Sequence, residues 1–263
     1  MKKAKIGFWG AGKMAEGILS AIADKRSVVM AEKLEARARD LKKRYGVCVC
    51  ADVKEVARTA DLVFLAVKPQ DMEAVAAEVK PLLRKGQVVV SIVAGKTLAK
   101  LRQAFGPKVG LIRVMPNLAL RAGAGMCAIC PAPRVAAAAV KAVEAILGGA
   151  GATVVLKEKD FDAVTALSGS GPAYFAYMEE AMMEGGIALG LKPAVAHLLA
   201  EQTMYGTAKY LRESGADLGE FIAGVCTKGG TTAAGMVKLS KPGFKKTVAA
   251  TLAAAARRSK ELA

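Results

Sequence analysis

Over the first 155 or so residues, short and almost uninterrupted apolar runs alternate with alanine-rich helical stretches. The apolar runs are KIGFWG (5–10), SVVMA (27–31), DLVFLAV (61–67), VVVSIV (88–93) and VGLIRVM (109–115). Strands that are apolar on both faces are typical of a parallel sheet covered by helices on each side. The pattern therefore predicts a doubly wound α/β domain with a parallel sheet.

The pattern changes near residue 157, and from Asp160 onward it is almost entirely helical. Ser170 precedes Pro172 and is expected to cap the helix that Pro172 begins, because serine favours the cap and proline is tolerated in a first helical turn. Further helices are expected from Pro193 to 213–215 and over 218–225, 232–239 and 244–262. We expect two domains, 1–157 and 158–263.

A glycine-rich loop follows the first strand, in GFWGAGKMAEG. Gly10, Gly12 and Ala15 have the spacing GxGxxA, which suits a tight turn, a close approach of a pyrophosphate to the backbone, and close packing of helix on strand. The helix that begins there offers unpaired N–H groups to phosphates. Because the motif follows a strand and opens a helix, it predicts binding of a dinucleotide.

Three other strand ends carry side chains that suit such a ligand. Glu32 and Lys33 follow the second strand, where an acid accepts hydrogen bonds from a ribose diol and a lysine meets a 2′-phosphate. The alternative is that both are simply exposed at a helix start. Lys68 in AVKPQ and Asn117 in RVMPN lie where ligands of such sheets bind, although an exposed structural lysine is an equal alternative for Lys68.

The net charge of +16 raises nucleic acid as a partner, but the basic residues are dispersed among acids and aromatic residues are only 5% of the chain. We therefore expect no nucleic-acid binding, and a basic surface that attracts anionic substrates. No apolar run approaches the length of a membrane span, and no secretion signal is visible, so we expect a cytoplasmic protein.

Four of the five cysteines form two short pairs, Cys48 with Cys50 and Cys127 with Cys130. Such pairs occur in redox and zinc sites, and a four-thiolate site made from both is an alternative. Free thiols in a reducing compartment are the preferred interpretation, because the single histidine, His197, is far away in the sequence. We expect no metal.

A second glycine-rich loop, VCTKGGTTAAGM (225–236), joins two glycines to two threonines and then to small residues. It predicts a tight turn that feeds a helix, with hydroxyls and backbone N–H groups at the helix start. Such an arrangement binds anions.

The stretches GAGKMAEG, LAVKPQD, RVMPN, TALSGSGPAYFAYMEEA and TKGGTTAAGM, in this order, resemble the pyrroline-5-carboxylate reductase family over essentially the whole chain. The resemblance implies an N-terminal Rossmann domain and a helical C-terminal dimerisation domain. It also implies reduction of 1-pyrroline-5-carboxylate to L-proline by NADPH or NADH, the last step of proline biosynthesis. The implied assembly is a homodimer or a higher oligomer such as a ring of dimers.

The resemblance assigns residues to ligands. It places the cofactor on Gly10, Ala11, Gly12, Lys13, Met14, Ala66, Val67, Lys68, Pro69, Ala94 and Gly95, to which the strand-end argument adds Glu32, Lys33 and Asn117. It places the carboxylate substrate on Gly229, Gly230, Thr231 and Thr232. The charge of the neighbouring Lys228 suits the same carboxylate, and the alternative is that this side chain points to solvent. We expect Thr232 to be the catalytic hydroxyl, hydrogen-bonded near the ring.

The chain departs from the usual family pattern at three places: Leu118 and Ala119 replace Thr-Pro, Lys228 replaces a common proline, and an acid stands at Glu32. Glu32 favours NADH, whereas Lys33 and Arg37, one helical turn apart, favour NADPH. We expect both cofactors to work, with a modest preference for NADPH.

No titratable side chain recurs in a dehydrogenase-like arrangement, so we expect no obligatory protein general acid and an imine that arrives protonated. SGSGP is expected to serve close packing, with Ser170 or Tyr174 reaching the ligand as the alternative. A β-hydroxyacid dehydrogenase is a rival interpretation, but the helix PAYFAYMEEAMMEGG lacks the lysine which that class requires. A non-catalytic dinucleotide-binding regulator is a rival of another kind.

Overall fold

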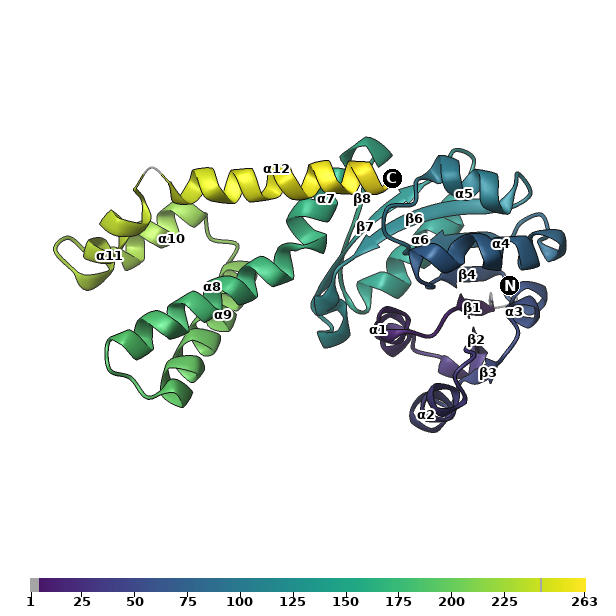
Figure 1. The fold of residues 1–263 in the computed structure, drawn as a ribbon, viewed down its shortest axis with the longest axis horizontal. Coiled ribbons are helices and arrows are strands. Elements are labelled where there is room, and N and C mark those ends of the chain that lie inside the picture. The colour runs from purple at the N-terminus through teal and green to yellow at the C-terminus, as the bar shows by residue number, and fades with distance from the viewer. Residues whose placement is uncertain (1–4, 242) are drawn as a thin grey trace. The chain divides into compact units, whose positions relative to one another are not determined.

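The structure, a computed structural model, describes residues 5–241 and 243–263 (Figure 1). Its contacts divide the chain into two compact units. The first contains the residues up to Ser170 together with Ala255–Ala263, and the second is Gly171–Ala254. The two units are described separately.

The first unit is built on one sheet of eight strands in the order β3-β2-β1-β4-β5-β6-β7-β8. The strands are β1 (Ile6–Trp9), β2 (Val28–Ala31), β3 (Cys48–Cys50), β4 (Leu62–Leu65), β5 (Val88–Ser91), β6 (Gly110–Pro116), β7 (Gly125–Pro131) and β8 (Gly151–Val155). Strands β1 to β6 are parallel, and their order is that of the Rossmann fold. The prediction of a doubly wound α/β domain is confirmed.

Six helices cover the two faces of this sheet. They are α1 (Lys13–Ala21), α2 (Glu35–Tyr45), α3 (Val53–Thr59), α4 (Met72–Val79), α5 (Leu98–Phe105) and α6 (Ala137–Gly148). Side chains of α1, α2 and α6 belong to one buried cluster, and those of α3, α4 and α5 to the other. Short 3₁₀ turns lie at Lys25–Ser27, Pro69–Asp71, Lys80–Leu82, Leu118–Ala122 and Glu158–Asp160.

Strand β1 shows why its run of residues is apolar throughout. Phe8 points to one face and stacks on Phe64, with ring centroids 5.0 Å apart. Trp9 points to the other face, stacks on Phe105 at 5.7 Å, and donates a hydrogen bond to the Val53 carbonyl at 3.0 Å. Because successive side chains of a strand alternate between faces, both must be apolar when both faces are covered.

The sheet is mostly, not entirely, parallel. Strand β7 is antiparallel to β6, and β8 is parallel to β7. The connection 117–124 between β6 and β7 is too short for a crossover, which needs a dozen or more residues, so the chain turns back on itself. Strands β3 and β8 and helices α3 and α6 are additions to the elements expected from the sequence.

The helical pattern that begins near Asp160 starts inside the first unit. Helix α7 (Phe161–Val164) continues into a π-helical turn (Thr165–Gly169), after which α8 (Gly171–Ala188) begins. Ser170 has right-handed helical dihedral angles, and its N–H donates to the Thr165 carbonyl at 2.9 Å. The prediction of Ser170 as an N-cap is therefore wrong, because the chain is already helical before this residue.

The second unit holds α8, α9 (Pro193–Ser214), α10 (Leu218–Val225), α11 (Thr231–Leu239) and the first part of α12 (Phe244–Leu262). Helices α8 and α9 pack against each other as a hairpin (Figure 1). Among the described residues of this unit only Gly171, Ala196 and Ala200 are buried. An isolated copy of this unit therefore has almost no core.

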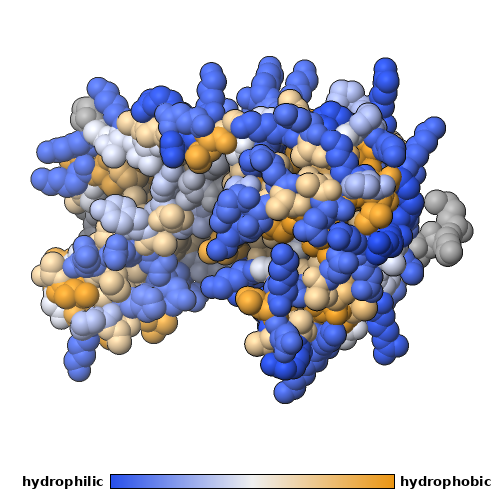
Figure 2. All heavy atoms as spheres, turned by 45° about the vertical axis from the view of Figure 1, so that its right-hand side comes forward, coloured by the Kyte–Doolittle hydropathy of each residue, from blue (hydrophilic) through white to orange (hydrophobic). Residues whose placement is uncertain are grey.

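Large apolar side chains on α8 and α9 are exposed instead, among them Phe175, Tyr177 and Leu198. In the described ranges, no helix combines the length and the apolar character that a membrane crossing requires. The face in Figure 2 shows long hydrophilic side chains interspersed with apolar ones.

Candidate functional site

The first glycine loop has the geometry that its sequence predicts. Gly10 has a φ of +90°, and a Cβ atom added to it would lie 2.7 Å from the Ala66 carbonyl oxygen, so only glycine fits. Gly12 begins α1 without a side-chain cap, and a Cβ atom added there would meet nothing within 4 Å. Ala15, in the first turn of α1, is buried in the core. The loop is thus tight at Gly10 and open at Gly12.

A cavity of about 310 Å³ lies at the carboxyl edge of the parallel strands. Its lining comes from the end of β6, from the loops after β4, β5 and β6, from α1 and from the π-helical turn: Met14, Ala66, Val67, Ile92, Ala94, Met115, Pro116, Asn117, Leu118 and Gly169. Ligands of open α/β sheets bind at this edge. None of these lining side chains is titratable.

The structure thus brings Met14, Ala66, Val67, Ala94 and Asn117 together around one cavity, as the sequence predicts. The neighbouring residues of the same loops lie just outside it: Lys13, Lys68, Pro69 and Gly95. Ile92, Met115, Pro116, Leu118 and Gly169 also line the cavity, although the sequence did not assign them to a ligand. Met115, Pro116 and Gly169 lie within the motifs RVMPN and SGSGP, Leu118 directly follows RVMPN, and Ile92 directly follows β5.

Asn117 has two partners within the fold. Its Oδ1 accepts the Met126 N–H at 3.1 Å, and its Nδ2 donates to the Ser168 hydroxyl at 3.4 Å. Gly169 packs against the end of the flexible Met115 side chain, because a Cβ atom there would lie 2.4 Å from the Met115 Cε atom. The π-helical turn is therefore fitted against the cavity wall, in keeping with the frequent occurrence of such turns at functional sites.

Glu32 and Lys33 directly follow β2, as predicted, and Lys33 is exposed. Glu32 Oε1 accepts the Leu34 N–H at 3.0 Å, so part of this carboxylate caps its own turn. Arg37, unlike the exposed Lys33, is bound to other groups of the fold. Its Nε donates to the Ala11 carbonyl at 3.2 Å, and its guanidinium pairs with Glu16 and, at 3.3 Å, with Asp40. Arg37 is therefore held by partners within the fold, and its role as a second phosphate ligand stays a prediction.

Glu16 is the centre of this network and was not apparent from the sequence. Its side chain is 10% exposed, and the carboxylate binds Arg37, Arg44 and the Tyr45 hydroxyl. Burial alone would raise the pKa of Glu16, but the hydrogen bonds from Arg37 and Tyr45 and the two arginine charges hold it below its ordinary value. The network fixes α2 against α1 and, through Arg37, contacts the glycine loop itself.

The second glycine loop lies in the second unit, where it begins α11. Gly229 has a φ of +74°, and a Cβ atom added to Gly230 would lie 2.5 Å from the Thr227 hydroxyl oxygen. Thr231 and Thr232 occupy the first turn of α11 and are exposed, as is Lys228. The turn, the helix start and the two exposed hydroxyls agree with the arrangement that the sequence predicts.

Comparison with known proteins identifies the family. The family model for pyrroline-5-carboxylate reductase dimerisation matches residues 158–262, and the model for coenzyme F420-dependent NADP oxidoreductase matches residues 5–95. The pyrroline-5-carboxylate reductase of Synechocystis is 39% identical, covering 98% of each chain. That of Arabidopsis thaliana is 36% identical, covering 98% of this chain and 95% of the relative. The chain belongs to the pyrroline-5-carboxylate reductase family.

Solved structures agree with this assignment. The pyrroline-5-carboxylate reductase of Coxiella burnetii superposes with a TM-score of 0.95 at 29% identity, covering 99% of this chain and 98% of that one. The pyrroline carboxylate reductase of Plasmodium falciparum, solved with NADP bound, has a TM-score of 0.86 at 30% identity, covering 100% and 99%. Members of the pyrroline-5-carboxylate reductase family are NAD(P)H-dependent enzymes that form proline. The assignment excludes the rival dehydrogenase class.

The cysteines take no part in a shared site in this family member. Strands β3 and β7, which carry the two pairs, are six positions apart in the sheet, or about 29 Å at the usual strand spacing. The four-thiolate alternative is therefore wrong. Burial raises the pKa of the Cys127 thiol to about 12, which keeps it protonated and inert at neutral pH. Within the described ranges no group of three potential metal ligands occurs.

Proposed function

We propose that this chain reduces 1-pyrroline-5-carboxylate to L-proline with NADPH as the preferred cofactor and NADH as a weaker alternative. The observation that supports the site is the cavity at the carboxyl edge of the sheet, directly beside the GxGxxA loop. Family membership supports the reaction. The choice of cofactor is supported by the exposed Lys33 and by the NADP in the Plasmodium falciparum relative.

The residues fit a nicotinamide dinucleotide. Gly12 leaves open the space that a Cβ atom would fill, and the first turn of α1 presents its N–H groups without a side-chain cap. We propose that Gly10, Ala11, Gly12, Lys13 and Met14 hold the pyrophosphate. When bound, the nicotinamide supplies the hydride.

The nicotinamide half would then lie along the loops after β4 and β5. We propose that Ala66, Val67, Ala94 and Asn117 form its walls, with Lys68, Pro69 and Gly95 at the rim or behind it. Because the lining is apolar apart from Asn117 and lacks titratable groups, it would exclude water and orient the ring, and would not exchange protons.

The substrate carboxylate is proposed to bind the start of α11. The N–H groups after Gly229 and Gly230 and the charge of Lys228 suit an anion, and the Thr231 and Thr232 hydroxyls are exposed in the same turn. We propose that Thr232 hydrogen-bonds near the ring nitrogen. The imine is proposed to arrive protonated, so that the protein orients the reactants and supplies no obligatory general acid.

The second unit is proposed to pair with another copy of this chain. The family model that matches it is a dimerisation model, and its exposed apolar side chains far outnumber its three buried residues. A homodimer is the smallest assembly that would cover them, and a ring of dimers is the larger alternative. Light scattering at micromolar concentration tests this proposal, which a monomer would refute.

Two further expectations remain proposals. The functional domains are proposed to be 1–157 and 158–263, in keeping with the start of the dimerisation model at residue 158. The cytoplasm is proposed as the location because all five cysteines are free, which is typical of reducing compartments.

The decisive experiment is oxidation of NADPH and of NADH by the purified protein on addition of pyrroline-5-carboxylate. We expect turnover with both and a higher kcat/KM with NADPH. Binding of NADPH without turnover would instead support the non-catalytic regulator. Circular dichroism shows that the protein tested is folded.

A further inference from the structure

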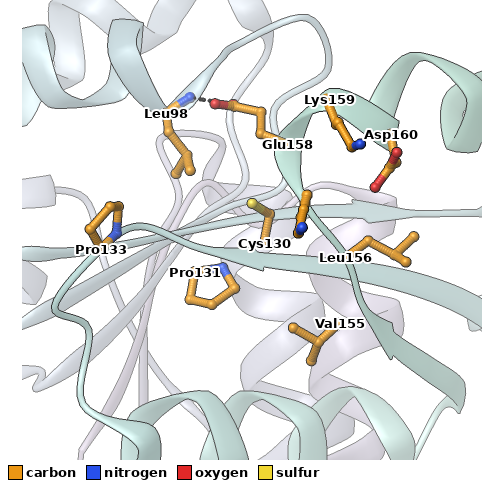
Figure 3. Close-up of a pocket in the computed structure, with 10 residues that line it drawn as sticks. Leu98, Cys130, Pro131, Pro133, Val155, Leu156, Glu158, Lys159 and Asp160 are labelled. Carbon is orange, nitrogen blue, oxygen red and sulfur yellow. Dashed lines mark hydrogen bonds between the residues drawn. The ribbon is translucent and has the colours of Figure 1, made fainter.

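The loop after β5, which carries Ala94 and Gly95, is held from outside the sheet at two points. At its far end the Leu98 N–H, the first of α5, donates to Glu158 Oε1 at 2.6 Å (Figure 3). Glu158 is itself held by Arg113 of β6 at 2.9 Å, and the Arg113 guanidinium lies 4.7 Å from the centroid of the Phe161 ring. The segment that follows β8 thereby fixes one end of the loop.

The second point involves the last turn of α12, which belongs to the first unit. Gly95 has a φ of +71°, and a Cβ atom added to it would lie 2.9 Å from the Leu262 carbonyl oxygen. The backbone of this turn therefore lies directly against the loop. Ser259, 7% exposed on the same turn, donates its hydroxyl to Asp162 Oδ1 at 2.7 Å. Asp162 lies in α7, four residues after Glu158.

We propose that the last turn of α12 is a positioning element for the cofactor. Ser259, through its hydrogen bond to Asp162, seats this turn against Gly95 and fixes the loop whose Ala94 lines the cavity. The proposal rests on the proposed function, because it takes that cavity as the nicotinamide site. Neither Ser259 nor Asp162 touches the ligand, so both are positioning residues.

The chemistry of the contact explains why it holds the turn firmly. A hydroxyl that donates to a carboxylate makes a charge-assisted hydrogen bond, stronger than one between neutral groups. Leaving the partly buried carboxylate without this donor costs its desolvation as well. Loss of the bond would free the turn to move away from Gly95, and the nicotinamide half of the site would lose a fixed wall.

The test is a binding titration of the full-length protein, followed by NADPH fluorescence. The variants are Ser259→Ala, Asp162→Ala and the double variant, with Asp162→Asn as the conservative exchange, because an amide oxygen still accepts the Ser259 hydroxyl. Arg258→Gln, which breaks an exposed ion pair with Glu261 on the same turn, is the matched control. The second ligand is 2′-phospho-ADP-ribose, which lacks the nicotinamide.

We expect Ser259→Ala and Asp162→Ala each to raise the Kd of NADPH about fivefold, a change that corresponds to the net contribution of one hydrogen bond. The Kd of 2′-phospho-ADP-ribose should change less than twofold. The double variant should bind no more weakly than either single variant. Asp162→Asn, which keeps an acceptor but loses the charge, should raise the Kd less than Asp162→Ala does, and Arg258→Gln should resemble the wild type. If one variant fails to fold, the other still reports on the same bond.

Two results would overturn the proposal. One is an unchanged Kd of NADPH in the folded variants, and the other is an equal loss of affinity for both ligands, which would indicate a general structural effect. Wild-type binding is measured first. Failure of the wild type to bind NADPH would refute the proposed function, whereas normal wild-type binding with unaffected variants refutes the positioning role alone.

Discussion

Alanine substitutions at Gly10 and Gly12 should separate folding from cofactor binding within a single loop. At Gly10 the backbone has a left-handed φ, and the added Cβ atom would approach the Ala66 carbonyl oxygen to 2.7 Å. The conformational cost is about 1–2 kcal/mol, and the backbone contact adds a similar amount. We therefore expect Gly10→Ala to lower stability by about 2–4 kcal/mol and to lower Tm by roughly 4–16 °C.

Gly12→Ala should behave in the opposite way. The residue has an ordinary φ of −68°, and its Cβ atom would meet nothing within 4 Å. Alanine at a helix cap costs only about 0.5–1 kcal/mol relative to glycine, so Tm should fall by less than about 4 °C. The same Cβ atom would occupy the proposed position of the pyrophosphate, and the Kd of NADPH should rise by about a hundredfold or more, on the order of 3 kcal/mol.

The assays are thermal unfolding followed by circular dichroism, and NADPH fluorescence titration below the transition. Gly12→Ala with wild-type affinity for NADPH would refute the proposed path of the pyrophosphate over Gly12. Gly10→Ala with wild-type Tm would refute the argument from its dihedral angle and its contact with Ala66.

Three further predictions follow from the site. Thr232→Ala should lower kcat/KM for pyrroline-5-carboxylate about tenfold or more, which corresponds to the loss of one charge-assisted hydrogen bond, and should leave the Kd of NADPH unchanged. Unchanged kinetics would show that Thr232 takes no part in the site. Lys33→Ala should lower the NADPH-to-NADH ratio of kcat/KM about threefold. Arg37→Ala removes the ion pair with Glu16, so it should lower Tm and change that ratio little. A large change in the ratio with an unchanged Tm would instead indicate that Arg37 binds the phosphate. Because the pKa of Glu16 is lowered in the folded state, the folded protein binds a proton at this carboxylate more weakly than the unfolded chain does. The ionised Glu16 therefore contributes its full stabilisation above the ordinary carboxyl pKa, and this stabilisation is lost as the pH falls through the lowered value. Urea unfolding at a series of pH values, from about 7 to well below the ordinary carboxyl pKa, should therefore show that the stability lost in Glu16→Gln is largest at the higher pH and shrinks as the pH falls. A difference that does not change with pH would contradict the pKa argument.

The parts of the fold that could be predicted depend on local sequence. The apolar runs of β1, β2, β4, β5 and β6 and the glycine that ends α2 are local signals, and the structure contains all of them. Gly46, for example, has the left-handed dihedral angles that a helix-ending glycine adopts. The positions of the loops around the cavity then follow, because strand ends of a parallel sheet meet at one edge.

The features that escaped prediction depend on distant partners. Nothing near Arg37 in the sequence reveals that Glu16, on another helix, neutralises it. The direction of β7 is decided by the length of a connection, and apolar periodicity carries no information about it. Ser170 has the sequence context of a cap, but the π-helical turn before it packs against Met115 of β6, a distant contact that a local pattern cannot show.

The scarcity of buried residues in Gly171–Ala254 has a consequence beyond the interface itself. When most of a unit's apolar surface is covered only by a second copy, the folded fraction of the protein depends on the concentration of that copy. Dilution then lowers the folded fraction by mass action. Activity measured at nanomolar enzyme should then decay on standing even in native buffer. For a chain built in this way, the level of expression in the cell is one of the determinants of its stability.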